Sequence, residues 1–213
     1  MSTPPTPTTP TTPTTPTTPT TARARAALTT AHAALGALLA DAAAVQRIET
    51  VARLMADCFC AGNKVLACGN GGSACDAMHF CEELTGRFRD DRDPLPAIAC
   101  VDAGHITCTA NDYGYDAVFE RWVRALAKPG DVVFLLSTSG NSANVVRAAE
   151  AAGEIGCARV ALLGNTGTTP GGTLANTCEH EWIVPGTTAD RIQELHMLIL
   201  HTVIECAEGL LAG

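Results

Sequence analysis

The chain has 213 residues, a formal net charge of −8 and a pI near 5.1. This length suits one domain with a core large enough to fold by itself. The acidic balance and the lack of a Lys/Arg cluster argue against nucleic acid as a direct ligand, because its phosphates would be repelled. No segment reaches the roughly 18 consecutive apolar residues of a membrane span, and no signal peptide is recognisable. We therefore expect a cytoplasmic protein that binds neither nucleic acid nor a membrane.

The ten cysteines form neither a CxxC pair nor a zinc-finger spacing. Most of them lie inside apolar stretches, as buried thiols do in a reducing cytosol. We therefore predict buried free cysteines rather than disulfides, at Cys58, Cys60, Cys68, Cys81, Cys100 and Cys206.

The first 21 residues repeat Thr-Thr-Pro with a period of three and carry no charged side chain. This composition favours extended polyproline conformation and cannot bury a core. We predict a disordered tail over residues 1–21 and a single domain over residues 22–213.

From Ala22 the composition changes to alanine-rich helix formers. After Gln46, apolar residues recur at three- and four-residue spacings, which predicts an amphipathic helix that ends at Gly62. Two helices therefore precede the first strand. Because a lone sheet would not cover their apolar faces, we expect them to pack against another subunit.

Beyond Gly62, apolar stretches alternate with helical ones. This pattern predicts an α/β fold in which a parallel sheet has helices on both faces. In such sheets ligands bind beyond the carboxyl ends of the strands, so we expect the site at the loops after the first three strands. The predicted strands are 64–68, 97–101, 132–136, 158–163 and 182–184, and a long helix is predicted over 188–211.

The first of these loops, residues 69–74 (GNGGSA), is rich in glycine. It fits the dinucleotide pattern G-x-G-x-x-G/A, and the second predicted strand ends at Asp102, where a ribose-binding acid would stand. A turn that only lets strand and helix pack closely explains the glycines equally well. This loop alone does not decide between a dinucleotide, a sugar phosphate and no ligand.

A serine loop, residues 137–142 (STSGNS), follows the third predicted strand, and a helix begins near Ser142. Hydroxyl groups and free backbone N–H groups at a helix N-terminus favour an anion. Capping of the helix would need only one serine, and a dinucleotide fold has no need for the other hydroxyls at this position. We therefore favour a small phosphorylated ligand.

Two helices carry candidate metal ligands. His79 and Glu83 are four residues apart, which places them on one face of a helix, where they form either a shared site or a surface contact. The last helix carries Gln193, His196 and His201. Gln193 and His201 are about 12 Å apart along the axis and reach one metal only if both side chains lean towards it. The spacing leaves His196 as a competing candidate.

Four motifs, CGNGGSACDAMHFCEELTGR, AND, STSGNSANV and ADRIQELH, resemble the phosphoheptose isomerases of the sugar-isomerase (SIS) domain family from about Gln46 to the C-terminus. The resemblance implies a flavodoxin-like three-layer sandwich that converts D-sedoheptulose 7-phosphate into D-glycero-D-manno-heptose 7-phosphate. It also implies Zn²⁺ and a homotetramer with active sites between subunits. The glycine loop would then bind substrate. A non-catalytic SIS-domain protein that binds or senses a sugar phosphate is the alternative.

The resemblance also assigns roles, and it selects His201 over His196. An aldose-ketose isomerisation through an enediol needs a base and an acid, for which we predict Glu83 and His201 respectively. Because a metal-bound carboxylate is a weaker base, Glu83 would have to be loosely coordinated or displaced by substrate. The implied metal contacts are His79, Glu83, Gln193 and His201, and the implied substrate contacts are Asn70, Gly71, Gly72, Asn111, Asp112, Ser137, Thr138, Ser139, Ser142 and Gln193.

Overall fold

The computed structural model describes residues 19–166 and 169–212. Most of the predicted Thr/Pro tail, residues 1–18, lies outside the described residues. The first helix, α1 (Thr20–Ala40), begins two residues before the predicted start of the domain at Ala22.

Five strands form one parallel sheet in the order β2-β1-β3-β4-β5. Each predicted strand is confirmed to within two residues at either end. The second strand is shorter than predicted, because the Val101 N–H turns back to the Ala99 carbonyl and Asp102 already caps the next helix. The strands are β1 (Val65–Gly69), β2 (Ala97–Ala99), β3 (Val132–Ser137), β4 (Ala158–Leu163) and β5 (His180–Ile183).

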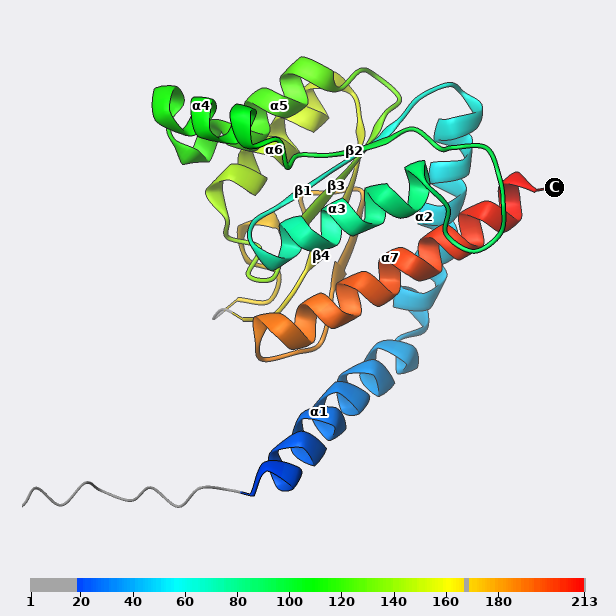
Figure 1. Ribbon diagram of the computed structural model, residues 1–213, viewed down its shortest axis with the longest axis vertical. Coiled ribbons are helices and arrows are strands. Elements are labelled where there is room, and N and C mark those ends of the chain that lie inside the picture. The colour runs from blue at the N-terminus through cyan, green and yellow to red at the C-terminus, as the bar shows by residue number, and fades with distance from the viewer. Residues whose placement is uncertain (1–18, 167–168, 213) are drawn as a thin grey trace, which may run out of the picture.

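Helices cover both faces of the sheet, as the sequence predicts (Figure 1). One face carries α2 (Ala42–Cys60), α3 (Gly72–Thr85) and α7 (Ala189–Leu211), with α7 lying between α2 and α3. The other face carries α4 (Ala103–Tyr113), α5 (Val118–Leu126) and α6 (Ala143–Ile155). Two short 3-10 helices, η1 (Tyr115–Ala117) and η2 (Gly172–Leu174), lie in connecting segments.

The alternating side chains of the central strands build two cores. Phe134 and Leu136 of β3 pack into the core under α2, α3 and α7, whereas Val133 and Leu135 pack into the core under α5 and α6. Because side chains of a strand alternate between the faces of a sheet, a strand covered on both faces is apolar throughout. This burial explains why β3 is a continuous apolar run.

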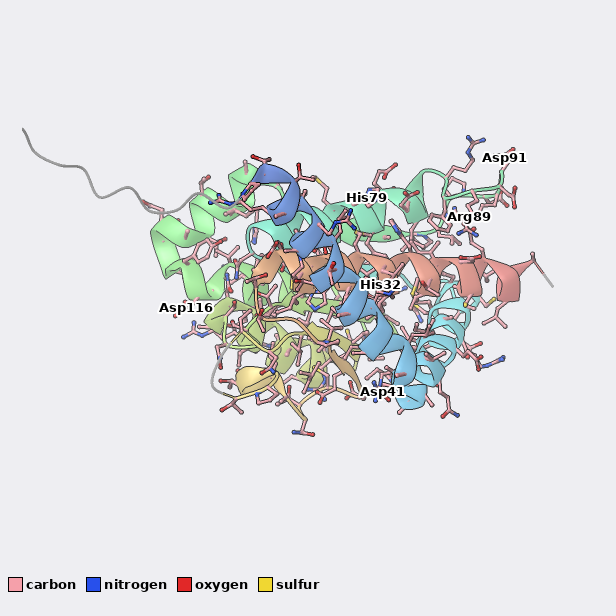
Figure 2. The ribbon with its side chains drawn as sticks, turned by 90° about the horizontal axis from the view of Figure 1, so that it is seen from below. His32, Asp41, His79, Arg89, Asp91 and Asp116 are labelled. Atoms are coloured by element: carbon pink, nitrogen blue, oxygen red, sulfur yellow. The ribbon has the colours of Figure 1, made fainter. Side chains whose placement is uncertain are left out.

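Helix α1 projects away from the rest of the chain (Figure 1). Leu28 and Leu39 on this helix are 72% and 71% exposed. Asp41, at the junction with α2 (Figure 2), caps α2 by accepting hydrogen bonds from the N–H groups of Ala43 and Ala44.

Among the described residues no single helix has the length and apolarity to cross a bilayer. Only α1 and α2 taken together do, and they meet at a bend of 76°.

The cysteine predictions are confirmed in part. All ten cysteines are free, and Cys58, Cys68, Cys81 and Cys100 are buried. The prediction is wrong for Cys60, which is exposed, and Cys206 is only half-buried. Cys60 is the last residue of α2, two positions after the buried Cys58, and at about 100° per residue its side chain lies on the opposite face of the helix.

The strand order reverses direction between β1 and β3. The chain leaves β1 towards β2 on one side, and later continues from β3 towards β4 on the other. At such a switch point the loops after the two strands diverge and leave a crevice at the carboxyl edge of the sheet. The glycine loop and the serine loop are the two loops that border it.

Candidate active site

The glycine loop joins β1 to α3 through close backbone contacts. Gly71 has a φ of 55° and is the N-cap residue of α3, where no side chain of the described residues makes a capping hydrogen bond. A Cβ on Gly69 would lie 2.8 Å from Ser73 Cβ and 2.9 Å from the Leu136 carbonyl oxygen. Glycine is therefore needed at position 69 for packing, and the uncapped N–H groups at the start of α3 favour an anion.

Asn70 connects the glycine loop to two other segments. Its Nδ2 donates to Asn144 Oδ1 at 2.8 Å, and Asn144 Nδ2 donates back to Asn70 Oδ1 at 2.9 Å. The Tyr115 hydroxyl also donates to Asn70 Oδ1, at 2.9 Å. Asn70 and Tyr115 both line a cavity of about 280 Å³. The glycine loop, α6 and η1 therefore meet at one amide.

The serine loop is organised by its first hydroxyl. Ser137 Oγ accepts a hydrogen bond from the Gly140 N–H at 3.1 Å and lies 3.2 Å from Ser142 Oγ. Ser142 is the N-cap residue of α6, but its side chain makes no capping hydrogen bond. Helix capping by Ser142 therefore does not explain this loop. Thr138, Ser139 and Ser142 are each only half-buried.

The segment before β5 supports the serine loop from outside. The Leu174 N–H donates to the Gly140 carbonyl at 3.1 Å, and Thr173 donates to Asn141 Oδ1 from both its N–H and its hydroxyl, at 3.0 and 2.9 Å. Gly140 and Gly172 have φ values of 64° and 59°, and a Cβ on either would collide with the opposing backbone. These two glycines allow the two segments to touch.

Three potential metal ligands, His79, Glu83 and His201, lie together between α3 and α7 and are called the metal cluster below. The Nε2 atoms of His79 and His201 are 3.1 Å apart, and His79 Nε2 is 3.5 Å from Glu83 Oε1. One ligand atom from each residue lies within 4.8 Å of the others. His79 lies on α3 (Figure 2), and its Nδ1 is 3.4 Å from Glu82 Oε2. The structure thus brings together three of the four predicted metal ligands.

The surroundings of the metal cluster favour a neutral imidazole at His201. Burial and the neighbouring His79 lower the pKa of His201, although Glu83 acts in the opposite direction. The Phe88 ring lies 5.6 Å from the His201 ring. A neutral imidazole offers a lone pair to a metal, whereas an imidazolium does not.

Asp76 lies one turn before His79 on α3. Burial raises its pKa to about 6, with His79 acting in the opposite direction. Among the described residues its Oδ2 has no hydrogen-bond partner although the atom is buried. Asp76 is not among the site residues predicted from the sequence.

His196 has a different role from His201. It is completely buried, and its Nε2 lies 3.0 Å from the Leu163 carbonyl oxygen at the end of β4. Burial lowers its pKa to about 4. His196 is therefore a neutral core residue, and the geometry of α7 supports the choice of His201 that spacing left open.

The three remaining predicted site residues lie on two helices, Gln193 on α7 and the pair Asn111 and Asp112 on α4. Gln193 lies against the start of α3, where a Cβ on Gly72 would be 2.7 Å from Gln193 Oε1. Asn111 and Asp112 are exposed at the end of α4 and hydrogen-bond to each other at 2.7 Å. Within the described residues no hydrogen bond links that pair to either loop.

Asp102 does not stand free as a ribose ligand. Its Oδ1 accepts a hydrogen bond from the His105 N–H at 2.6 Å and so caps α4. The acid that the dinucleotide hypothesis requires is therefore engaged in a structural role.

A larger cavity, of about 550 Å³, lies away from the predicted site residues. It is bordered by residues 89–93 and the end of α7 (Figure 2). Its two arginines, Arg89 and Arg92, are ion-paired with Glu205 and Glu208. Because its lining includes none of the predicted site residues, we place the candidate site at the loops and the metal cluster instead.

Comparison with known proteins gives a consistent result. Residues 32–164 match the SIS domain family. The phosphoheptose isomerases of Fusobacterium nucleatum and Proteus mirabilis are 52% and 49% identical to this chain, over 76% and 86% of it and 82% and 94% of their own lengths. The solved phosphoheptose isomerase structures from Neisseria gonorrhoeae and Francisella tularensis superpose with TM-scores of 0.79 and 0.83, at 38% and 32% identity. They cover 89% and 90% of this chain and 98% and 100% of theirs.

Proposed function

The chain belongs to the SIS-domain family and, within it, to the phosphoheptose isomerases, and from this we propose that it converts D-sedoheptulose 7-phosphate into D-glycero-D-manno-heptose 7-phosphate. The observation that carries the proposal is the convergence of two imidazoles and a carboxylate from α3 and α7 in a chain that also has a serine loop at a helix N-terminus. The imidazoles and the carboxylate supply groups for proton transfer, and the serine loop supplies a site for an anion.

The phosphate end of the substrate is assigned to the serine loop. The hydroxyls of Thr138, Ser139 and Ser142, with the N-terminus of α6, favour an anion through hydrogen bonds and the helix dipole. Ser137, whose hydroxyl bonds within the loop, shapes it. Asn70, Gly71, Gly72 and Gln193 at the start of α3, with Asn111 and Asp112 beyond them, are proposed to contact the sugar.

The donor set of the metal cluster suits Zn²⁺. Ligand atoms at about 2.0–2.2 Å from a tetrahedral zinc are about 3.3–3.6 Å apart. The separations of 3.1 Å between the two Nε2 atoms and 3.5 Å between His79 Nε2 and Glu83 Oε1 are close to this range. Gln193 is the proposed fourth ligand. When bound, zinc would supply Lewis-acid polarisation of the sugar oxygens.

Proton transfer is assigned to Glu83 and His201. Glu83 would take a proton from C1 of the ketose to form an enediol and return it to C2. His201 would give a proton to O2 and accept one from O1, which completes the aldose. A carboxylate has two oxygens, so Glu83 can face His79 with Oε1 and retain Oε2 for the base role.

The proposed assembly is a homotetramer with active sites between subunits. The apolar, exposed surface of α1 supports it, because a lone helix gains most of its stability from packing. The proposed cellular location is the cytoplasm.

An activity assay tests the proposed function. Purified protein mixed with sedoheptulose 7-phosphate should form the aldose, which NMR detects directly. If zinc-loaded protein binds the sugar phosphate without turnover, the non-catalytic alternative is correct. A calorimetric titration with NAD should show no saturable binding, because Asp102 is engaged as a helix cap.

Metal analysis tests the metal cluster separately. We expect one zinc per chain, lost on His79→Ala and retained on His32→Ala, which removes an exposed histidine of α1. Zinc that survives in His79→Ala would exclude this cluster as the site.

A further inference from the structure

The Asn70 side chain is restrained from two directions. Asn144 pairs with it through two reciprocal amide hydrogen bonds of 2.8 and 2.9 Å, and the Tyr115 hydroxyl adds a third of 2.9 Å. Asn144 is only 3% exposed and lies in the first turn of α6, directly after the serine loop. Tyr115 begins η1, beyond the end of α4.

The hydrogen-bond capacity of the Asn70 amide is almost used up by these contacts. An amide offers two acceptor sites on oxygen and two N–H donors. Both acceptor sites of Oδ1 are filled, by Asn144 and Tyr115, and one Nδ2 proton goes to Asn144. Within the described part of the chain, the second Nδ2 proton has no protein partner.

The network also opposes rotation of the Asn70 amide by itself. If Asn70 alone rotated by half a turn, its Nδ2 would face the Asn144 Nδ2, and its Oδ1 would face the Asn144 Oδ1. Donor would meet donor and acceptor would meet acceptor, inside a region where unpaired polar groups are costly. In the orientation that the structure shows, one Nδ2 proton of Asn70 is available.

We propose that Asn144 and Tyr115 are positioning residues that hold Asn70 as a hydrogen-bond donor towards an oxygen of the bound sugar phosphate. The proposal rests on the proposed function, because it takes the glycine loop to be part of the substrate site. A cavity of about 280 Å³ borders Asn70, Gly71 and Tyr115, so the glycine loop faces open space beside this amide. Through this amide, the loop that follows β1 is tied to the helix that follows the serine loop.

Kinetics of single and double variants test the proposal. Tyr115→Phe removes one hydrogen bond from an exposed residue and should raise KM about threefold; Asn144→Ala should raise KM about tenfold. Neither substitution should change kcat by as large a factor as it changes KM. Both effects should vanish in an Asn70→Ala background, because both residues act through Asn70. The matched control is Tyr113→Phe, an exposed tyrosine two residues away, which should leave KM unchanged.

An equal rise in KM with and without Asn70 would overturn the proposal, and so would no rise in either single variant. Because Asn144 is buried, the thermal midpoint of each variant is measured in parallel. Tyr115→Phe keeps the test decisive if Asn144→Ala fails to fold.

Hydrogen exchange separates this proposal from the proposed function, since it requires no substrate. In Asn144→Ala and Tyr115→Phe, amide exchange of residues 70–74 should rise, while that of β4 should not. If wild type is inactive on sedoheptulose 7-phosphate but this exchange pattern holds, the proposed function fails and the restraint on Asn70 stands. Unchanged exchange of residues 70–74 in both variants would overturn the restraint itself.

Discussion

His79 and His201 are 122 residues apart in the chain, yet their Nε2 atoms are 3.1 Å apart. Glu83 adds a carboxylate whose side chain is only 16% exposed, compared with 45% for His79. At the scale of single residues, the proposed base Glu83 is therefore largely shielded from solvent, whereas His79 is partly exposed to it.

Glu83→Gln should lower kcat by about 10²–10⁴-fold, because the amide cannot accept the proton from carbon. The control is Glu150→Gln, which removes the same charge from an exposed position of α6. Initial rates at saturating substrate measure both. A Glu83→Gln enzyme that turns over at the wild-type rate would remove this residue from the catalytic assignment.

The buried His196 should make stability depend on pH. Its pKa is lowered to about 4 in the folded chain, against 6.5 ordinarily, so below pH 6.5 the unfolded chain binds a proton that the folded chain does not. Wild type should lose about 2 kcal/mol of unfolding free energy between pH 7.5 and pH 5 relative to His196→Gln. Urea denaturation at the two pH values measures the difference.

Asp76 acts with the opposite sign, because its pKa is raised to about 6 in the folded chain and its contribution is lost as the pH rises through that value. Both proteins in the comparison retain Asp76, so its effect cancels. Equal pH dependence of wild type and His196→Gln would contradict the buried neutral state of His196.

At the scale of elements, the contact between the serine loop and the segment before β5 is the feature most sensitive to one added methyl group. In Gly172→Ala the Cβ would lie 2.7 Å from Asn141 Oδ1 and closer still to the Ser139 carbonyl oxygen, on a residue with a φ of 59°. We expect displacement of the serine loop and a rise in KM of roughly tenfold, since loss of a good hydrogen bond costs about 1 kcal/mol or more. Enzyme kinetics check this.

Gly36→Ala provides the matched control, because a Cβ there would meet nothing within 4 Å. This glycine lies inside α1, where alanine is favoured by about 0.5–1 kcal/mol. The control should keep wild-type KM with equal or higher thermal stability. The same KM in both variants would mean that the serine loop does not depend on Gly172.

At the scale of the whole molecule, α1 projects from the rest of the chain, and Leu38 is its only buried residue. The proposed tetramer should use its apolar side chains, and the double substitution Leu28→Glu and Leu39→Glu should reduce the mass measured by light scattering. The two leucines are 72% and 71% exposed, so the fold of one chain does not need them. Arg147→Glu, on the exposed face of α6, should keep the wild-type mass. An unchanged mass in the double variant would exclude α1 from the interface.

Much of the fold could be predicted because it follows from short-range patterns. The continuous apolar runs at 132–136 and 158–163 and the helical spacing after Gln46 depend on neighbours within about one helical turn. Boundaries were less accurate where another element competes for the same residues. At the end of β2, the Asp102 side chain caps α4 and ends the strand early.

Part of the candidate site was missed for a related reason. Asn144 looks like an ordinary helix residue, and Tyr115 lies in a connecting segment. Only the pairing of the loop after β1 with α6 and η1 gives both residues a common partner in Asn70. Asn144 lies within the STSGNSANV motif and Tyr115 lies outside all four motifs, and the roles that the resemblance implies include neither residue.

The sequence by itself determined the alternation of strands and helices, the two loops rich in glycine and serine, and the shared face of His79 and Glu83. Each of these depends on residues close together in the chain. Spacing along α7 left His196 and His201 open and the resemblance selected His201; the tertiary structure gives the physical reason, because His201 reaches His79 while His196, five residues earlier on the same helix, faces the core. Which face of α7 meets α3 is set by packing of the whole core, and a rotation of that helix would exchange the two histidines without altering any local pattern.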